Sequence, residues 1–202
     1  MRGVFVTGTD TGIGKTLVSA WLARGWGAEY WKPIQTGIAE GLDADTVARL
    51  AGVRVHPGRW LLRAPLSPHL AARRDGVTIT LDDFALPRTD RPLVVEGAGG
   101  VLVPLDDAGT MMAGLIARLG LPVVVVARGG LGTINHTLLT LEALRARGLE
   151  PAGVVLNGPL GDGNLSAVET FGRVRVLGAI PPLGPQPSLE GLAPPPALES
   201  LA

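Results

Sequence analysis

The sequence contains no cysteine, which excludes a disulfide framework, a thiolate metal site and a cysteine nucleophile. Its 18 basic and 18 acidic residues leave no net charge at neutral pH, whereas an obligate nucleic-acid or anionic-membrane partner would favour a basic surface. No apolar run approaches the roughly 20 residues that span a bilayer, and no signal peptide is recognisable before the first predicted strand. We therefore expect a cytoplasmic protein of 202 residues, with one domain and no nucleic-acid or membrane partner.

Lysine is also scarce, because only two of the 18 basic residues are lysines. Lys15 lies in the glycine-rich segment 8–16, and Lys32 opens the segment 32–37; both follow an apolar, strand-like run. Arginine is a planar fork, whereas lysine is a compact point charge that fits among phosphate oxygens. Chance survival of two lysines would not place one of them in a phosphate-binding motif. We interpret both as active-site residues.

Short β-branched apolar runs alternate with longer helix-like stretches along most of the chain. Strands are predicted at residues 4–7, 29–32, 92–96, 122–127, 153–157 and 174–180. Helices are predicted at about 15–24, at 44–51, from residue 67 onward, and at 134–147 with Thr133 as N-cap and Gly148 as stop. The proline-rich residues 184–202 are interpreted as an extended surface tail, and residues 37–92 resist a full assignment.

This alternation predicts an α/β fold with a mainly parallel sheet flanked by helices on both faces. Ligands of such sheets bind at the carboxyl ends of the strands. Lys15, Lys32, Glu96 and Asn157 all end or follow a predicted strand. We therefore expect these four side chains at one edge of the sheet.

The segment between the first strand and the first helix has the composition of a phosphate-binding loop. Five residues separate Gly8 from Gly14, one more than in the common pattern, but Gly12 and Gly14 still allow backbone N–H groups to turn around phosphate oxygens. Lys15 would meet the β- and γ-phosphates, and the Thr16 hydroxyl would ligate Mg²⁺. A glycine-rich turn without a ligand is the alternative, but the flanking strand and helix favour a nucleotide site in a P-loop NTPase-like fold.

A magnesium–nucleotide site needs further oxygen ligands. Glu96 is the best candidate, since an acidic residue at the tip of an interior strand is costly unless it is metal-bound or paired; an ion pair with arginine or a helix cap is the alternative. Asp43 and Asp45 are candidates for another ligand, and either could equally be an N-cap of the following helix. Lys32 precedes Pro33, which keeps the chain extended. Its ammonium group could stabilise a transferring phosphoryl group or a bound oxyanion.

Two asparagines lie where they could bind ligands. Asn157 ends a late strand and lacks the Lys-x-Asp continuation of guanine-specific sites, so we favour contact with adenine. Asn135 lies at a helix start, where backbone N–H groups can hold a carboxylate. The three histidines show no metal-ligand spacing and are interpreted as structural or surface residues.

Taken together, these motifs resemble those of the dethiobiotin synthetase family. The resemblance extends over about residues 3–183 and rests on residues 8–11, 14–16, 32–33, 36–37, 44–46, 67–69, 95–100, 131–136, 157 and 180–181. No single motif is decisive, but the ordered set is specific. The five-residue spacing in the phosphate loop is also the pattern of that family.

The resemblance implies a homodimeric, ATP-dependent cyclo-ligase of biotin biosynthesis that binds ATP, Mg²⁺, CO₂ and 7,8-diaminononanoate. One substrate amine forms a carbamate with CO₂, and the carbamate oxygen attacks the γ-phosphate of ATP to give a carbamic-phosphoric anhydride. The second amine then closes the cyclic urea of dethiobiotin and expels phosphate.

Carried over by position, the resemblance implies a role for each matching residue. The catalytic residues would be Lys15, Lys32 and Thr11, and the Mg²⁺ ligands would be Thr16, Asp45 and Glu96. The substrate would contact Thr36 and, across the dimer interface, Gly132, Thr133 and Asn135. The nucleotide would contact Gly12, Ile13, Gly14, Lys15, Thr16, Leu17, Glu96, Gly97, Ala98, Gly99, Asn157, Gly158, Pro181, Pro182 and Leu183.

The chain departs from the family pattern at two places. Gly12 stands where many relatives carry Glu, and the segment after Asn157 is short, so substrate contacts there are not assigned. The main alternative is a P-loop ATPase switch of the partitioning or cell-division type, but those proteins carry a signature lysine where this chain has residues 9–11. A cobyrinate-type synthetase would need an attached glutaminase domain with a cysteine nucleophile, and the chain has no cysteine.

Overall fold

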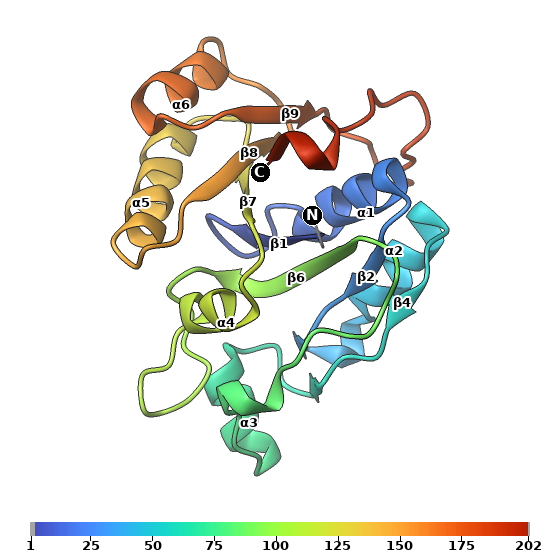
Figure 1. The fold of residues 1–202 in the computed structure, drawn as a ribbon, viewed down its shortest axis with the longest axis vertical. Coiled ribbons are helices and arrows are strands. Elements are labelled where there is room, and N and C mark those ends of the chain that lie inside the picture. The colour runs from blue at the N-terminus through green and yellow to red at the C-terminus, as the bar shows by residue number, and fades with distance from the viewer. Residues whose placement is uncertain (1–2, 202) are drawn as a thin grey trace.

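Parallel strands form the centre of the molecule, as Figure 1 shows for the computed structural model, which describes residues 3–201. The strands are β1 Gly3–Gly8, β2 Glu29–Trp31, β3 Ile34–Thr36, β4 Val55–His56, β5 Trp60–Leu62, β6 Leu93–Gly100, β7 Val123–Arg128, β8 Pro151–Asn157 and β9 Val176–Ile180. Seven of them form one sheet in the order β4-β2-β6-β1-β7-β8-β9, and β3 pairs with β5. Every pairing between these strands is parallel, which confirms the predicted sheet type.

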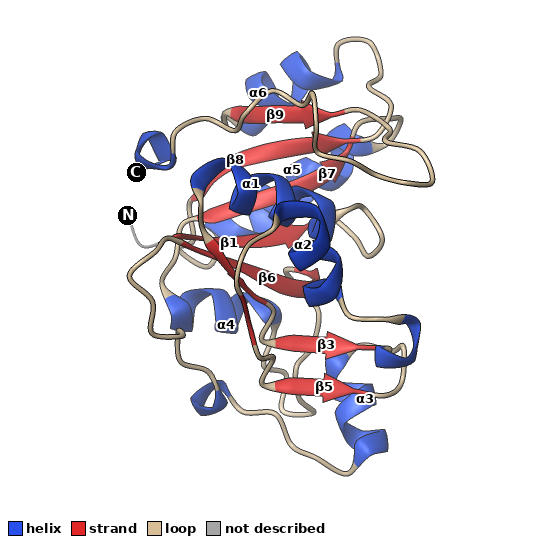
Figure 2. Ribbon diagram, turned by 90° about the vertical axis from the view of Figure 1, so that its right-hand side faces the viewer, coloured by secondary structure: helices blue, strands red, loops and turns tan. Residues whose placement is uncertain are grey.

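Helices cover both faces of the large sheet. They are α1 Lys15–Trp26, α2 Asp43–Ala51, α3 Pro68–Asp75, α4 Met112–Leu119, α5 Thr133–Arg145 and α6 Asn164–Gly172, with short 3-10 turns at Ile38–Glu40, Leu81–Asp83 and Leu198–Leu201. In Figure 2, α1 and α2 lie in front of the sheet, whereas α4 and α5 lie behind it. The predicted α/β architecture is therefore confirmed. Within residues 3–201, no helix has both the length and the apolar character that a bilayer crossing would need.

Two apolar cores, one on each face, explain why the central strands are apolar throughout. In β1, Val4 and Val6 pack into the core shared with α1, while Phe5 packs into the core on the opposite face. In β7, Val124 and Val125 divide between the same two cores. A strand buried on both faces needs apolar side chains at every position, and this is the pattern that the sequence shows.

Several predicted elements end at other residues than expected. The first helix continues to Trp26, and the last strand begins at Val176. The helix predicted from residue 134 begins at Thr133, because Gly132 is the N-cap with a φ of 88° and Thr133 is already buried inside the first turn. The prediction of Thr133 as the N-cap was therefore wrong.

Helices α4 and α6 and strands β3, β4 and β5 were not predicted. The three strands lie between residues 34 and 62, mostly in the region that resisted assignment, and each has only two or three residues. Such short segments carry too little periodicity to identify them in a sequence. They form because segments distant in the chain pair in the fold, as Ile34 does with Trp60.

The sequence predicted Glu96 at the end of a strand. In the structure it lies inside β6, which continues to Gly100. Val6 of β1 pairs with Glu96, but Gly8 pairs with Gly100, so β6 carries extra residues between these two pairs. Such a bulge bends the strand locally. Because β6 continues past Glu96 in this irregular form, the carboxylate lies beside β1 and close to the loop that follows Gly8.

The C-terminal segment, residues 184–201, crosses the outer side of α1. The indole N–H groups of Trp21 and Trp26 donate hydrogen bonds of 2.8 Å each to the carbonyl groups of Ala193 and Pro196. Three leucines of the segment are buried in the core shared with α1: Leu189, Leu198 and Leu201. The segment is thus mainly without helix or strand, as predicted, but it contributes to the core and ends in a 3-10 turn.

We expect Leu198→Ala to lower the free energy of unfolding by about 2–5 kcal/mol, the usual cost of deleting a buried leucine side chain. Leu198 is 4% exposed, so its removal leaves a cavity against α1. The control is Leu160→Ala, since Leu160 is 51% exposed and should change stability by less than about 0.5 kcal/mol. Urea unfolding measures both variants. Equal stability of the two would mean that the C-terminal segment does not unfold together with the core.

Candidate active site

A cavity of about 330 Å³ opens at the carboxyl edge of the sheet. Its lining comes from the phosphate loop, the segment after β2, the start of α2 and strand β6. The lining residues are Thr11, Gly12, Gly14, Lys15, Thr16, Lys32, Gln35, Thr36, Asp43, Glu96, Ala98 and Gly99. Both lysines of the chain therefore reach one cavity, although they are far from each other in sequence.

The phosphate loop is held in shape by its glycines and by a contact from β8. Gly12 and Gly14 have φ values of 72° and 93°, in the region that side chains other than glycine rarely adopt. Asn157 donates from Nδ2 to the carbonyl oxygen of Ile13 at 2.8 Å, and a Cβ on Gly14 would collide with that amide. Asn157 was predicted as an adenine contact. That contact stays a prediction, and what the structure shows is that Asn157 fixes the loop leading into α1.

Lys15 is the first residue of α1 and is buried at the base of the cavity. Its Nζ donates to the carbonyl oxygen of Asp10 at 2.9 Å. Burial lowers the pKa of Lys15, and the nearby carboxylate of Glu96 offsets this only in part. The residue before it, Gly14, has no side chain to cap the helix, so the N-terminal N–H groups of α1 face the cavity side without a side-chain acceptor.

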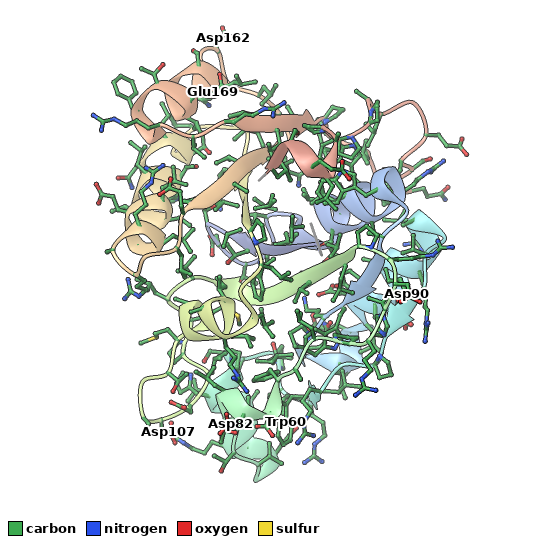
Figure 3. The ribbon with its side chains drawn as sticks, in the orientation of Figure 1. Trp60, Asp82, Asp90, Asp107, Asp162 and Glu169 are labelled. Carbon is green, nitrogen blue, oxygen red and sulfur yellow. The ribbon has the colours of Figure 1, made fainter. Side chains whose placement is uncertain are left out.

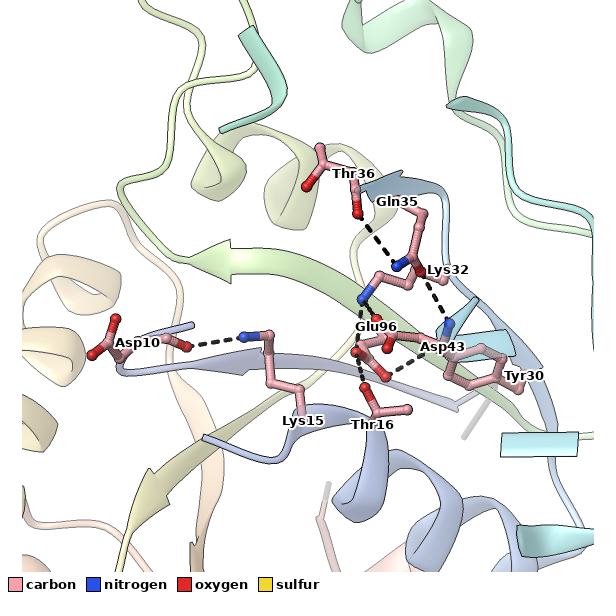
Figure 4. Close-up of polar contacts among 9 residues, drawn as sticks. All are labelled: Asp10, Lys15, Thr16, Tyr30, Lys32, Gln35, Thr36, Asp43 and Glu96. Carbon is pink, nitrogen blue, oxygen red and sulfur yellow. Dashed lines mark hydrogen bonds and ion pairs between the residues drawn. The ribbon is translucent and has the colours of Figure 1, made fainter. Parts of the chain in front are cut away.

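The carboxylate of Glu96 is fully buried and accepts hydrogen bonds from three side chains (Figure 4). Thr16 Oγ1 and Lys32 Nζ donate to Oε1 at 3.1 Å and 2.9 Å. Tyr30 donates from its hydroxyl to Oε2 at 2.9 Å. These contacts offset the loss of hydration of a buried carboxylate. The ion-pair alternative left open by the sequence is thus present, with a lysine as the partner and not an arginine.

Lys32 lies between two carboxylates. Its Nζ contacts Glu96 Oε1 and Asp43 Oδ2. Burial would lower the pKa of Lys32, but the negative charges of Glu96 and Asp43 outweigh it and raise the pKa above the ordinary lysine value. The group is therefore an ammonium at neutral pH, and it faces the cavity above the Gly12–Gly14 turn.

The structure distinguishes the two aspartates at the start of α2, while the assignment of Asp45 as a Mg²⁺ ligand stays a prediction. Asp43 lines the cavity and pairs with Lys32, whereas Asp45 is exposed and does not line the cavity. Gln35 explains the placement, because its Oε1 accepts the backbone N–H of Asp43 at 3.2 Å and ties α2 to β3. Gln35 was not among the predicted residues. Its position in the segment 32–37, which the sequence did single out, was the only available signal.

We expect Asp43→Asn to lower kcat/KM roughly 10- to 100-fold, the usual cost of losing a partner that orients a site. The reason is that Lys32 loses one of its two carboxylate partners. Asp45→Asn is the matched comparison, because Asp45 lies two residues further along the same turn of α2 and is exposed. Steady-state kinetics of both variants at several Mg²⁺ concentrations decide between the two positions. The reverse order of effects would restore the assignment implied by the resemblance.

The oxygen atoms in the cavity fit a magnesium ion. The Thr16 hydroxyl and the carboxylates of Asp43 and Glu96 line it together, and all are hard ligands of the kind that Mg²⁺ prefers. Among residues 3–201, no group of three or more His, Cys, Asp or Glu side chains is arranged as a metal site. Mg²⁺ is usually bound by one or two carboxylates plus substrate phosphates, and not by a protein cage.

Other acidic side chains lie at the periphery of the molecule, as Figure 3 shows for Asp82, Asp90, Asp107, Asp162 and Glu169. All five are exposed. Burial and an ion pair with Lys32 therefore distinguish Glu96 from these acids, which are solvated.

Several residues implied by the resemblance lie outside the cavity lining. They are Ile13, Leu17, Gly97, Gly132, Thr133, Asn135, Asn157, Gly158, Pro181, Pro182 and Leu183. Gly132 and Asn135 are exposed at the start of α5, but the hydroxyl of Thr133 is buried 3.4 Å from that of Thr137. The backbone N–H of Thr133 also has a partner, since it donates to the carbonyl oxygen of Gly130 at 3.2 Å. Residues 181–183 follow β9, whose last residue pairs with Asn157, so they lie at the same edge of the sheet.

A second cavity, of about 370 Å³, adjoins the first one. Its lining residues are Gly8, Thr9, Asp10, Thr11, Gly100, Val101, Leu102, Val103, His136, Leu139, Thr140 and Ala143. Thr11 lines both cavities, and leucine, valine and alanine side chains line much of the second. An extended molecule could therefore pass from a polar cavity into a more apolar one at Thr11.

Comparison with known proteins relates this site to a biosynthetic family. A family model described as an AAA domain matches residues 2–186. An ATP-dependent dethiobiotin synthetase BioD from Paramagnetospirillum magneticum is 59% identical over 198 residues, which cover 96% of this chain and 96% of that relative. The chain belongs to the dethiobiotin synthetase family. A further synthetase of this name, from Brucella ovis, is 49% identical over 88% of this chain and 85% of the relative.

The chain is also similar to one bifunctional protein in sequence and to two solved structures in fold. A biotin biosynthesis bifunctional protein BioCD from Bordetella avium is 57% identical, and the match covers 90% of this chain and 40% of that protein. A ParA family ATPase from Chlorobium tepidum has a TM-score of 0.55 at 10% identity, covering 90% of this chain and 85% of that one. Chloroplast FtsY from Physcomitrella patens has a TM-score of 0.56 at 18% identity, covering 100% and 64%. These two structures confirm the P-loop NTPase-like fold alone, and the sequence matches do not favour the partitioning-ATPase alternative.

Proposed function

We propose that this dethiobiotin synthetase family member forms the cyclic urea of dethiobiotin from 7,8-diaminononanoate and CO₂, with ATP as co-substrate. One observation carries the proposal: both lysines of the chain lie around a single cavity with Thr16 and Glu96, above a phosphate loop. Phosphoryl transfer depends mainly on positioning and on stabilising negative charge. Two ammonium groups beside a candidate magnesium site provide both.

The proposed reaction has three steps. A substrate amine and CO₂ form a carbamate, and a carbamate oxygen attacks the γ-phosphorus of ATP while the bond to the ADP oxygen breaks. The second amine then attacks the carbonyl carbon of the resulting anhydride. The ring closes, phosphate leaves, and the amine proton passes to the medium.

Seven residues of the cavity have a role in this proposal. Lys15 and the N–H groups at the start of α1 hold the phosphates. Lys32 stabilises the charge on the carbamate and on the transferring phosphoryl group. Thr11 and Thr36, which also line the cavity, donate hydrogen bonds to the carbamate. Mg²⁺ would neutralise charge on the β- and γ-phosphates, and the residues that would hold it are Thr16, Asp43 and Glu96.

We also propose that the protein is a homodimer and that the alkyl chain of the substrate lies in the second cavity. Leu102 and Leu139 line that cavity and are 51% and 56% exposed, and Leu131 nearby in sequence is 99% exposed. Exposed leucines of this kind favour a contact with another chain. Light scattering after gel filtration tests the dimer, and a monomer at micromolar concentration would contradict it. A cytoplasmic location stays a prediction.

Incubation with ATP, Mg²⁺, ¹³C-bicarbonate and 7,8-diaminononanoate tests the proposed reaction. Mass spectrometry should detect dethiobiotin that carries one ¹³C atom, with one ADP and one phosphate released for each product molecule. Omission of the diamine is the control and should suppress the release of phosphate. ATP hydrolysis without a labelled cyclic urea would contradict the proposal and would favour the alternative of an ATPase switch.

A further inference from the structure

Tyr30 is the only tyrosine of the chain, and its hydroxyl touches the central carboxylate of the cavity. The residue is 0% exposed and does not line the cavity itself. In residues 3–201 its hydroxyl makes the one side-chain hydrogen bond to Oε2 of Glu96, whereas Oε1 receives hydrogen bonds from Thr16 and Lys32. The two carboxylate oxygens thus have separate partners (Figure 4).

We propose that Tyr30 is a positioning residue that holds Glu96 Oε2 and thereby turns Oε1 toward Thr16, Lys32 and the magnesium–nucleotide complex. The proposal rests on the proposed function in one respect, namely that Glu96 takes part in holding Mg²⁺. In this proposal Tyr30 touches neither nucleotide nor substrate and acts only through Glu96.

The sheet register explains how a residue of β2 reaches this carboxylate. Tyr30 pairs with Val94 of β6, and Glu96 lies two residues further along β6 on the same face. The phenol ring is buried in the core shared with α1, so its hydroxyl is directed by packing and not by a flexible stem. The last torsion of a glutamate side chain is broad, so hydrogen bonds decide how the carboxylate is turned.

A purely structural role for the ring does not explain the hydroxyl. A buried hydroxyl that found no partner would be costly, and phenylalanine would fill the same space. The chain uses phenylalanine where only a buried ring is needed, as at Phe5 and Phe84, which are 0% and 1% exposed. A partner that orients a metal-site ligand typically contributes 10- to 100-fold in metal affinity or activity.

Tyr30→Phe removes the hydroxyl and keeps the ring. We expect the Mg²⁺ concentration that half-saturates nucleotide-dependent binding to rise roughly tenfold, while the affinity for ATP in EDTA stays unchanged. Calorimetric titrations with and without Mg²⁺ measure both quantities. Ser19→Ala is the matched control, because the Ser19 hydroxyl is buried on α1 without a hydrogen-bond partner, and this variant should change neither quantity.

Two results of these titrations would overturn the proposal. One is an unchanged Mg²⁺ dependence in folded Tyr30→Phe. The other is an equal loss of ATP affinity with and without Mg²⁺, which would indicate a structural role alone. In a Glu96→Gln background, Tyr30→Phe should have no further effect on the Mg²⁺ dependence, and additive effects would likewise count against the proposal.

The single tyrosine allows a second measurement that needs no substitution. Growth with 3-fluorotyrosine labels Tyr30 alone, so ¹⁹F NMR shows one resonance from this site. That resonance should shift when Mg²⁺ is added to the ATP complex and should not shift when Mg²⁺ is added without nucleotide. An unchanged resonance would contradict the proposal. Because these readouts concern binding, they decide the role of Tyr30 even if no cyclic urea is formed.

Discussion

Lys32→Ala should reduce cyclic-urea formation at least roughly 100-fold and leave ATP binding measurable, because the variant loses one of the two ammonium groups in the cavity. The phosphates keep Lys15 and the N–H groups at the start of α1. The rate of labelled dethiobiotin formation measures the first effect, and calorimetry with ATP measures the second. Turnover like that of the unaltered protein would refute the role of Lys32.

Lys15→Ala is the comparison for this variant, since Lys15 is the only other lysine. It should lose ATP affinity as well as turnover, because Lys15 lies at the start of α1 in the phosphate loop. If both variants lost ATP binding equally, the division of roles between the two lysines would be wrong.

Lys32→Ala should also destabilise the protein in EDTA. Lys32 pairs with the fully buried Glu96, and breaking one side of a buried ion pair typically costs about 3–5 kcal/mol. Mg²⁺ with ATP should restore part of the lost stability, because ligands that bind only the folded state stabilise it. Thermal melting with and without Mg²⁺–ATP measures the recovery, and a variant as stable as the unaltered protein in EDTA would contradict this account.

Glu96→Gln should raise the Mg²⁺ concentration required for half-maximal activity by roughly tenfold or more, since the charge of the ligands sets the affinity for hard cations. Glutamine keeps the shape of the side chain and an acceptor for the Tyr30 hydroxyl, so the fold should persist. The same change removes one of the two negative charges in contact with Lys32, the one at 2.9 Å on Oε1. A magnesium titration of the rate measures the effect.

The matched control for Glu96→Gln is Glu29→Gln. Glu29 is also buried, but it pairs with His56 at 2.6 Å, away from the cavity lining. Its substitution should leave the Mg²⁺ dependence of the rate unchanged. An identical shift in both variants would mean that the loss of any buried carboxylate, and not of a magnesium ligand, causes the effect.

Much of the fold was predictable because strong local patterns report it. The continuous apolar runs of β6, β7 and β8 indicated strands buried on both faces, and the glycines of the loop before α1 indicated a phosphate site. The short strands β3, β4 and β5 were not predictable, since two or three residues carry no clear period. The bulge in β6 was equally hidden, because it depends on how Gly8 and Gly100 pair.

The sequence allowed us to predict which residues supply the main charged and hydroxyl groups of the cavity. Lys15, Lys32, Thr16 and Glu96 were identified from composition, loop chemistry and strand position, and the structure brings all four together. The choice between Asp43 and Asp45 was not predictable, because both lie in the first turn of α2 and differ only in which side of the helix they occupy. Gln35, which accepts the backbone N–H of Asp43, helps to decide which of the two faces the cavity.

The amino-acid sequence by itself determined which chemical groups this protein brings to a phosphate: two lysines, a loop rich in glycine and an acid in an apolar strand. Those signals are local and do not depend on what surrounds them. The tertiary structure alone decided which groups touch one another. Tyr30 meets Glu96 because β2 lies beside β6, and Asp43 meets Lys32 because Gln35 holds the start of α2. Contacts between distant segments arise from packing, which no single stretch of sequence encodes.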